Sequence, residues 1–320
     1  MGGNPPESSI FMDLDYQRFS KHVDVISWDS YPNWSNDYET TETLAMKTAL
    51  MNDVMRGLKH DSYLIMESTP SQVNWHPFNK SKRPGMHEMG SLQQIAHGAN
   101  SVLYFQLHQS RGSSEMFHGA VVTHSLSNRT RVFKDVSLVG KDLEKLQPLL
   151  KSKYTHPKIA IVFDYDNVWA LDDARNYSDQ TKKYWHTIQS HYSVFWQNNI
   201  PVDIISAQDD LSHYTLVIDP MHFMMDIEYM EKIEKYVSSG GNLVGTYMTG
   251  MVDKNYLAYL GGWPERLQRI YGLSYVETDT LYPKQTNTII WEDNEYKVID
   301  YADVFEQKGA TSLAYYEDDF

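Results

Sequence analysis

The chain has 320 residues, no cysteine and a formal net charge of −14. This length is enough for two domains that each bury a core. The acidic balance argues against nucleic acid and anionic membranes as partners, because their phosphates would repel the chain. The lack of cysteine excludes disulfides, thiolate zinc sites and a cysteine nucleophile.

Targeting signals are not evident in the sequence. No stretch is both apolar enough and long enough to span a bilayer. The first residues, MGGNPPE, lack the basic and apolar regions of a secretory signal peptide. We therefore expect a cytoplasmic protein without membrane association.

The first half of the chain alternates between strand and helix patterns. Short apolar runs predict strands, and apolar spacing near 3.6 residues predicts the helices between them. In chain order we expect a strand at His22–Ser27, a helix at Thr41–His60, a strand ending at Glu67, a helix at Gly85–Gly98 and a strand at Ala99–Gln106. This order indicates a parallel α/β layout. Three strands cannot close an eight-stranded barrel.

Glu67 is the most informative residue of this half, because it ends an apolar run and Trp75 follows shortly after. Parallel barrels carry catalytic side chains at the C-terminal ends of their strands. A carboxylate beside an aromatic platform is what a glycosidase needs. The alternative is a helix cap or a solvated loop charge.

The second half predicts a doubly wound parallel sheet. The expected strands are Lys158–Asp164, Val202–Ile205, Tyr214–Asp219 and Asn242–Thr246, with a helix at Tyr229–Ser239 that Gly240 and Gly241 stop. Asp164, Asp166 and Asp219 lie at strand ends, where such folds bind ligands. No GxGxxG motif follows the first strand, and an amidotransferase nucleophile is absent, so we expect a role in assembly.

Metal sites are not predicted. The acidic residues Asp164, Asp166, Asp172 and Asp173 lack an EF-hand pattern, so a solvated acidic loop is the preferred interpretation over a cation site. The thirteen histidines include no HExxH, and no second histidine follows His87-Glu88 at zinc-binding spacing. We expect no metal and no cofactor.

Residues from about Ile10 to Leu146 resemble the catalytic barrel of the family-42 glycoside hydrolases, the bacterial β-galactosidases. The resemblance rests on SWDSYP at Ser27–Pro32, MESTPSQVNWHPFN at Met66–Asn79 and EMFHG at Glu115–Gly119. Residues from about Pro157 to Tyr282 resemble the middle domain of that family, a flavodoxin-like or amidotransferase-like module that packs between the subunits of a trimer.

The resemblance implies a role for each matching residue. Glu67 corresponds to the catalytic nucleophile and Trp75 to the aromatic wall of the galactose subsite. Tyr31, Glu115 and His118 correspond to residues that hydrogen-bond the nucleophile or the sugar hydroxyls. The implied substrate is a β-galactoside or galacto-oligosaccharide, and the implied assembly is a homotrimer. For His76, His108 and His124 we expect packing or capping roles.

The chain also departs from the family pattern. The family's acid/base glutamate follows an asparagine on the fourth barrel strand, whereas the match here starts at about the sixth. The Asn294-Glu295 pair lies in a charged stretch that predicts a surface turn, so it is not the missing acid. We therefore expect a fragment that is inactive alone.

The implied fold is a partial (β/α)8 TIM barrel, about its last three strands, followed by a flavodoxin-like, class I amidotransferase-like doubly wound domain. The implied boundaries are 1–150 for the barrel part, 151–288 for the trimerisation domain, and 289–320 for a tail or the start of a C-terminal β domain. A non-catalytic oligomerisation module is the alternative function. A ligand-binding amidotransferase-like regulator is a third possibility, by analogy of fold alone.

Overall fold

The computed structural model describes residues 14–150, 156–175 and 177–318. The chain divides into two compact units, Met1–Pro157 with Tyr192–Ile204, and Lys158–His191 with Ile205–Phe320. The N-terminal MGGNPPE segment and the predicted boundary at residue 151 lie outside the described residues. Among the described residues, no helix is long and apolar enough to cross a membrane.

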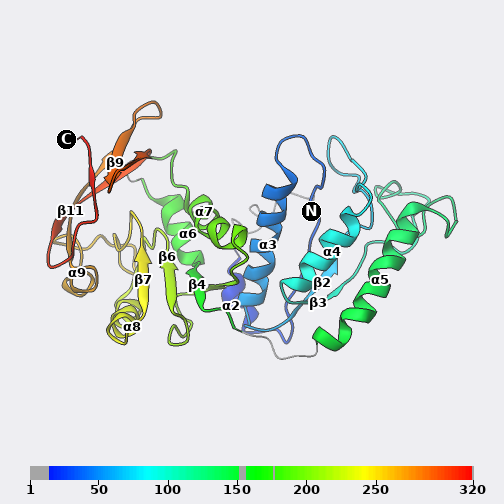
Figure 1. Ribbon diagram of the computed structural model, residues 1–320, viewed down its shortest axis with the longest axis horizontal. Helices are drawn as coiled ribbons and strands as arrows, with labels where there is room; N and C mark the ends of the chain where they lie inside the picture. The colour runs from blue at the N-terminus through cyan, green and yellow to red at the C-terminus, as the bar shows by residue number, and fades with distance from the viewer. Residues whose placement is uncertain (1–13, 151–155, 176, 319–320) are drawn as a thin grey trace. The chain divides into compact units, whose positions relative to one another are not determined.

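The first unit is built on three parallel strands with helices between them (Figure 1). The strands form one sheet of order β1-β2-β3, and both neighbouring pairs run parallel. The predicted alternation of strand and helix is confirmed. In chain order the elements are α2 (Tyr16–Ser20), β1 (Ser27–Asp29), α3 (Thr41–Gly57), β2 (Tyr63–Glu67), α4 (Met86–Ala96), β3 (Ala99–Val102) and α5 (Arg131–Leu150).

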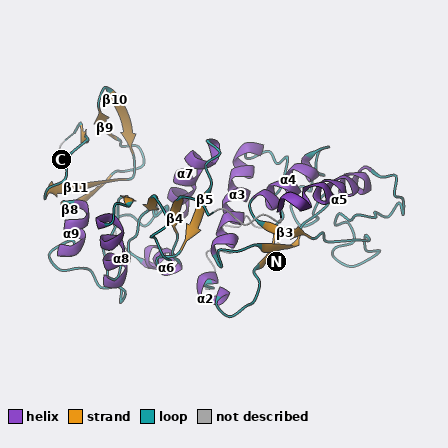
Figure 2. Ribbon diagram, turned by 60° about the horizontal axis from the view of Figure 1, so that its bottom comes forward, coloured by secondary structure: helices purple, strands orange, loops and turns teal. Residues whose placement is uncertain are grey.

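The central strand β2 places Glu67 at the C-terminal end of this sheet. Tyr63 and Ile65 are buried on one face of the strand, as period-two alternation requires. Glu67 is the last residue of β2, and its Cα partner in the ladder is Asp29, the last residue of β1. Figure 2 shows α4 beside β3, and these two elements are in contact.

Two predicted strand limits were wrong. The expected strand at His22–Ser27 is a turn and a bend, and β1 begins only at Ser27. Asp24 and Val25 are exposed, and sheet pairing starts where the Ile26 carbonyl accepts the amide of Leu64 at 3.0 Å. The third strand ends at Val102 instead of residue 106, because beyond it the amide of Phe105 bonds to the carbonyl of Ser68, past the end of β2, and the amide of Gln106 bonds to the carbonyl of Gly119.

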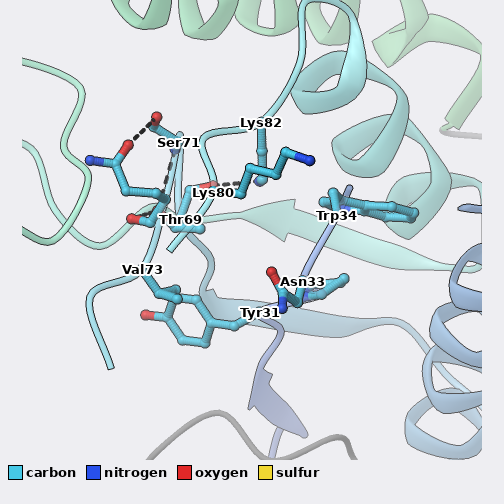
Figure 3. Close-up of a pocket in the computed structure, with 10 residues that line it drawn as sticks. Tyr31, Asn33, Trp34, Thr69, Ser71, Val73, Lys80 and Lys82 are labelled. Atoms are coloured by element: carbon cyan, nitrogen blue, oxygen red, sulfur yellow. Dashed lines mark hydrogen bonds between the residues drawn. The ribbon is translucent and has the colours of Figure 1, made fainter. Parts of the chain in front are cut away.

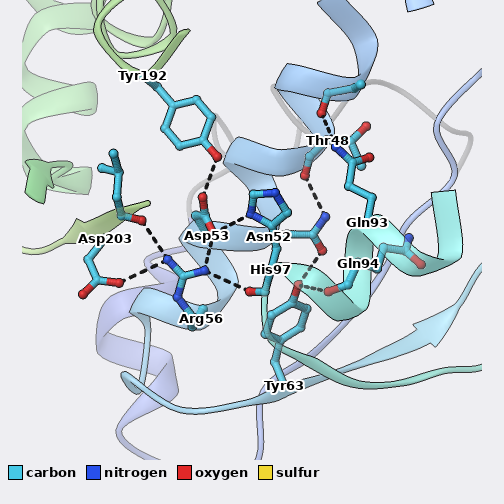
Figure 4. A network of polar contacts seen from close by, with 12 residues as sticks. Thr48, Asn52, Asp53, Arg56, Tyr63, Gln93, Gln94, His97, Tyr192 and Asp203 are labelled. Carbon is cyan, nitrogen blue, oxygen red and sulfur yellow. Dashed lines mark hydrogen bonds and ion pairs between the residues drawn. The ribbon is translucent and has the colours of Figure 1, made fainter. Parts of the chain in front are cut away.

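A buried polar network joins α3 to other segments of the first unit (Figure 4). The Arg56 guanidinium pairs with Asp53 and lies 3.1 Å from Asp203. Asp53 also accepts a hydrogen bond from the Tyr192 hydroxyl and lies 2.9 Å from Nδ1 of His97. Burial would raise the pKa of Asp53, but the charges of His97 and Arg56 hold it below its usual value. These contacts satisfy charges that would otherwise be costly to bury.

Replacing Arg56 with methionine is expected to destabilise the first unit by about 3–5 kcal/mol, the usual cost of removing one partner from a buried ion pair. Asp53 and Asp203 would stay buried without their guanidinium. Amide hydrogen exchange in α3 measures this locally, since two units can unfold in separate steps. The control is Arg18→Met, which removes an exposed pair with Asp15 and should cost at most about 1 kcal/mol.

The same variant gives a pH test with a defined sign. The pKa of Asp53 is lowered below the ordinary value of an aspartate, so its stabilising contribution is present above that ordinary value and is lost as the pH falls through the folded-state pKa. Without Arg56 this acid-dependent loss should shrink. Unchanged exchange in α3, or an unchanged acid response, would contradict the assigned role of the network.

The second unit contains a four-stranded sheet of order β5-β4-β6-β7, in which β4, β6 and β7 run parallel. The four predicted strands and the predicted helix are all present. In chain order the elements are β4 (Ile159–Val162), α6 (Tyr165–Asp173), α7 (Tyr184–Gln197), β5 (Val202–Ile205), β6 (Leu216–Asp219), α8 (Ile227–Ser238), β7 (Asn242–Gly245) and α9 (Glu265–Tyr271). Helix α7 and strand β5 each have residues assigned to both units.

The sheet of the second unit is covered by apolar side chains from strands and helices. Ala160 and Val162 of β4, Val217 of β6, and Met230 and Ile233 of α8 belong to one fully buried cluster. Figure 1 shows β6 and β7 side by side above α8. Helix α8 begins where the Asp226 side chain accepts the amide of Tyr229 at 2.8 Å.

The C-terminal segment is antiparallel. Strand β11 (Tyr301–Gln307) pairs with β8 (Leu273–Thr280), and β9 (Asn287–Trp291) lies between β10 (Asn294–Val298) and β12 (Ala314–Tyr316). The predicted boundary after residue 288 falls inside β9, and the division into domains stays a prediction.

Two local predictions in this half were wrong. Asp166, Asp172 and Asp173 belong to helix α6 and not to an acidic loop, because Asp164 caps that helix by accepting the amide of Asn167 at 3.0 Å. Asn294 and Glu295 begin strand β10 and are not in a turn. Their backbones pair with β9, and the turn lies just before them.

Candidate active site

Glu67 is the last residue of β2, and backbone pairing fixes its position there. Its carbonyl accepts the amide of Ser30 at 2.8 Å, which ties the ends of β1 and β2 together. The helix-cap alternative is wrong, because the next helix, α4, begins after Gly85. The alternative of a free loop charge is wrong as well, since the carboxylate accepts a hydrogen bond from Tyr31.

Tyr31 is the partner of the Glu67 carboxylate. Its hydroxyl donates to Oε2 of Glu67 at 2.8 Å. Burial raises the pKa of Tyr31, and the hydrogen bond to Glu67 with the charges of Glu67, Asp29 and Glu115 raises it further. The phenol therefore stays protonated and remains a donor across the pH range in which a carboxylate is ionised.

Aromatic rings form a wall beside this pair. The Tyr31 ring meets the Trp75 ring edge to face, with centroids 5.1 Å apart. The Trp75 ring stacks on the His118 ring, with centroids 5.0 Å apart. The Phe105 ring meets the His118 ring edge to face, with centroids 5.1 Å apart. Such packing fixes the orientation of Tyr31, whose hydroxyl reaches the Glu67 carboxylate.

His118 is fully buried in this arrangement. Its Nδ1 lies 2.9 Å from the Gly119 carbonyl, and because a carbonyl only accepts, Nδ1 must be the donor. In a neutral ring, Nε2 is then an acceptor, and it has no hydrogen-bond partner among the described residues. The residue is 0% exposed, and its ring contacts Tyr31, Trp75 and Phe105.

Glu115 is exposed on the loop that leads to His118. The amide of His118 donates to the Glu115 carbonyl at 3.0 Å, and Asn74, next to Trp75, donates to the carbonyl of Ser114 at 2.6 Å. The negative charge of Glu115 contributes to the raised pKa of Tyr31, which places the two groups near each other. Tyr31, Glu67, Trp75 and His118 are thus joined by direct contacts, and Glu115 belongs to the loop that reaches His118. The functional roles of these residues stay predictions.

Sequence reasoning assigned no role to Asp29 or Phe105, which also belong to this cluster. Asp29 ends β1 beside Glu67, and burial followed by the charge of Glu67 raises its pKa. Its place shortly after the predicted strand His22–Ser27, inside the SWDSYP motif, was the available signal. Phe105 gave no comparable signal, because its ring contact with His118 depends on two loops that are distant in sequence.

A small pocket lies beside Tyr31 (Figure 3). Its walls are the segment after β1 and the loop after β2. The residues that line it are Tyr31, Pro32, Asn33, Trp34, Thr69, Ser71, Gln72, Val73, Lys80 and Lys82. The pocket is shaped by the same two strand ends that bring Tyr31 to Glu67.

The other loop histidines make local contacts. Nδ1 of His108 lies 3.1 Å from the Gln109 carbonyl, and Nε2 of His124 lies 2.7 Å from the Ser110 carbonyl. The His76 ring lies 6.4 Å from Trp75. No group of three possible metal ligands is found around Glu67 in the described part of the chain. The expectation of a site without metal or cofactor stays a prediction.

Comparison with known proteins matches both halves of the chain. The family described as β-galactosidase matches residues 4–146, and the family described as β-galactosidase trimerisation domain matches residues 157–320. The chain is 49% identical to β-galactosidase GalA of Bacillus licheniformis over 97% of its length, and 47% identical to β-galactosidase GanA of Bacillus subtilis over 98%.

Solved structures agree with the sequence matches. Gan42B, a family-42 β-galactosidase, superposes with a TM-score of 0.93 and 48% identity, covering 97% of this chain and 45% of its own. A β-galactosidase from Bacillus circulans gives a TM-score of 0.89 at 35% identity, covering 97% of this chain and 46% of its own. The chain spans less than half the length of its curated relatives, 46% of GalA and 47% of GanA.

Proposed function

We propose that this chain, which belongs to the β-galactosidases of glycoside hydrolase family 42, supplies the nucleophile side of an active site that hydrolyses terminal β-D-galactosides with retention. Glu67 would attack the anomeric carbon, the glycosidic bond would break with the aglycone leaving protonated by the general acid, and a galactosyl-enzyme ester would form. Water would then release galactose. The substrate class is a β-galactoside or galacto-oligosaccharide.

The observation that carries this proposal is the pairing of Tyr31 with Glu67 next to the Trp75 ring. A nucleophilic carboxylate must be ionised and held in one orientation, and a donated hydrogen bond supports both. The aromatic wall gives the apolar face of a galactose ring a surface to stack on. Glu115, which is exposed, would select the sugar through its hydroxyls, since a site that hydrogen-bonds a hydroxyl discriminates strongly against its absence. His118 is fully buried, so it would support the sugar subsite by packing against Trp75.

A retaining glycosidase needs a second carboxyl group roughly 5–5.5 Å from the nucleophile to protonate the leaving group. We infer that this acid/base belongs to the part of the relatives that this chain does not span. The three parallel strands of the first unit would then be about the last three of a (β/α)8 barrel. A completed barrel would bring both carboxyl groups to one rim.

For the second unit we propose a flavodoxin-like, amidotransferase-like doubly wound domain that assembles the protein into a homotrimer. The match to a β-galactosidase trimerisation domain supports this. Residues 1–150, 151–288 and 289–320 remain the proposed divisions, and a cytoplasmic location remains a prediction. A purely non-catalytic oligomerisation module is the alternative function.

The activity test uses a full-length protein, made by joining this chain to the parts of GalA that it does not span. We expect hydrolysis of an aryl β-galactoside, with β-galactose as the first product by proton NMR, because two inversions retain configuration. Aryl α-galactoside and aryl β-glucoside serve as controls and should be poor substrates. α-Galactose as the first product, or no β-galactoside turnover by a folded trimer, would contradict the proposed function.

A further inference from the structure

Lys82 is a buried lysine that contacts the loop between Glu67 and Trp75. The residue is 6% exposed, and its Nζ donates to the Thr69 carbonyl at 2.5 Å (Figure 3). Thr69 is itself buried. The ammonium therefore holds a backbone carbonyl close to the end of β2, where Glu67 lies.

Thr69 is the centre of a compact set of hydrogen bonds. Its hydroxyl donates to the Gln72 carbonyl at 3.0 Å and accepts the amide of Ser71 at 3.3 Å. The Gln72 carbonyl also accepts the amide of Gly119 at 2.8 Å. The set thus links the loop after Glu67 with the backbone of Gly119, directly beside His118.

The two loops are packed backbone against backbone at this point. A Cβ added to Gly119 would lie 2.7 Å from the carbonyl oxygen of Gln72 and 3.1 Å from Oγ1 of Thr69. Real Cβ atoms do not approach that closely, so the contact leaves no free space. A displacement of Thr69 would therefore be passed to Gly119 and, through it, to His118 and its stacked partner Trp75.

The surroundings of Lys82 do not offer it an ion pair. Burial lowers the pKa of Lys82 to about 7, and no carboxylate contributes to that shift in the part of the chain that is described. The neighbouring His87 is also buried, and its pKa is lowered to about 3 by burial and then by the charges of Lys82 and Arg131. The Arg131 guanidinium also contacts Lys82, by donating a hydrogen bond to its backbone carbonyl at 3.0 Å.

Burying an amino group in a cationic neighbourhood is unfavourable. The hydrogen bond from Lys82 to the Thr69 carbonyl is the contact that offsets this cost. We propose that Lys82 is a positioning residue, whose amino group holds the loop between Glu67 and Trp75 so that nucleophile and aromatic wall keep one geometry. It touches no reacting atom. The inference rests on the proposed function for its kinetic consequence, but its structural consequence can be measured without any activity.

The structural arm uses the 320-residue chain. In Lys82→Met the side chain keeps its approximate length but loses its donor, so we expect the amides of Gly119 and Ser71 to exchange at least about tenfold faster. Exchange in α8 of the second unit should stay unchanged. Lys141→Met is the matched control, because Lys141 is an exposed lysine of α5 and does not line the pocket beside Tyr31, and it should leave all these amides at wild-type rates.

The kinetic arm uses the full-length protein. Since a misplacement of about 1 Å can cost about 100-fold in rate, we expect Lys82→Met to lower kcat on an aryl β-galactoside by about that factor. Active sites are counted from the burst of aryl alcohol with a 2-deoxy-2-fluoro aryl galactoside. A positioning role leaves the burst amplitude unchanged and slows its rate, whereas a role only in folding lowers the amplitude and leaves the rate per site unchanged.

The outcomes are distinguishable. Wild-type exchange of Gly119 in Lys82→Met, or a wild-type rate per active site, would overturn the positioning role. If the full-length protein hydrolyses no β-galactoside, the proposed function fails, and the exchange data still decide whether Lys82 fixes the loop. Lys141→Met with the same defects as Lys82→Met would also overturn the inference.

Discussion

Replacing Glu67 with glutamine in the full-length protein is expected to lower kcat on an aryl β-galactoside by about 10,000-fold or more, the scale on which enzymes lose activity with a catalytic group. Glutamine keeps the size of the side chain and can still accept from Tyr31, but it is a poor nucleophile. The fold should therefore survive while attack on the anomeric carbon is lost. Steady-state kinetics and amide exchange in β2 measure these two effects separately.

A second variant identifies the lost step. Glu67→Ala opens space at the α-face of the sugar, and added azide should take the place of the carboxylate. With an activated aryl galactoside the product should be α-galactosyl azide, because one displacement inverts the anomeric carbon. Recovery of β-galactosyl azide, or full activity of Glu67→Gln, would remove Glu67 from the role of nucleophile.

Tyr31→Phe separates the hydrogen bond from the carboxylate itself. The variant deletes the donor at 2.8 Å from Glu67 and keeps the ring that meets Trp75. A hydrogen bond to a charged group contributes about 1.5–3 kcal/mol, so a loss of roughly 10- to 150-fold is expected. This intermediate effect, between wild type and Glu67→Gln, would show that Tyr31 acts through the nucleophile.

The parallel strands could be predicted from the sequence because each coincides at least in part with a short apolar run. Strand β2 is the clearest case, with Tyr63 and Ile65 fully buried and Glu67 at its end. The limits of β1 could not be predicted in the same way. Val25 belongs to the apolar run but is exposed, and only the pairing with β2 decides where the strand starts.

The candidate site was predictable where chemistry follows a strand end, and not where it depends on contacts between loops. Tyr31, Glu67 and Trp75 belong to short motifs with recognisable residue types. Lys82 does not, because its importance comes from a carbonyl in another part of the loop. The Asp53 and Tyr192 contact was likewise invisible in the sequence, since it joins a helix of the first half to a residue of the second.

The 320-residue chain alone is expected to form a trimer and to hydrolyse neither lactose nor an aryl β-galactoside at a measurable rate. The match of residues 157–320 to a trimerisation domain supports the first expectation. The second follows from the missing proton donor, since general acid catalysis contributes roughly 100- to 10,000-fold. Pocket walls and sugar contacts from the unspanned part of the relatives would be lost as well. Light scattering at micromolar concentration and a product assay on the same sample test both expectations.

Asp29 is the group that could make this last prediction fail. It ends the strand beside Glu67, and burial with the charge of Glu67 raises its pKa, which favours the protonated form that an acid catalyst needs. Turnover by the 320-residue chain that disappears in both Glu67→Gln and Asp29→Asn would mean that one rim holds nucleophile and acid. Turnover that depends on Glu67 but survives Asp29→Asn would place the proton donor elsewhere in the chain. An inactive trimer would leave the nucleophile to this chain and the acid to the part that it does not span.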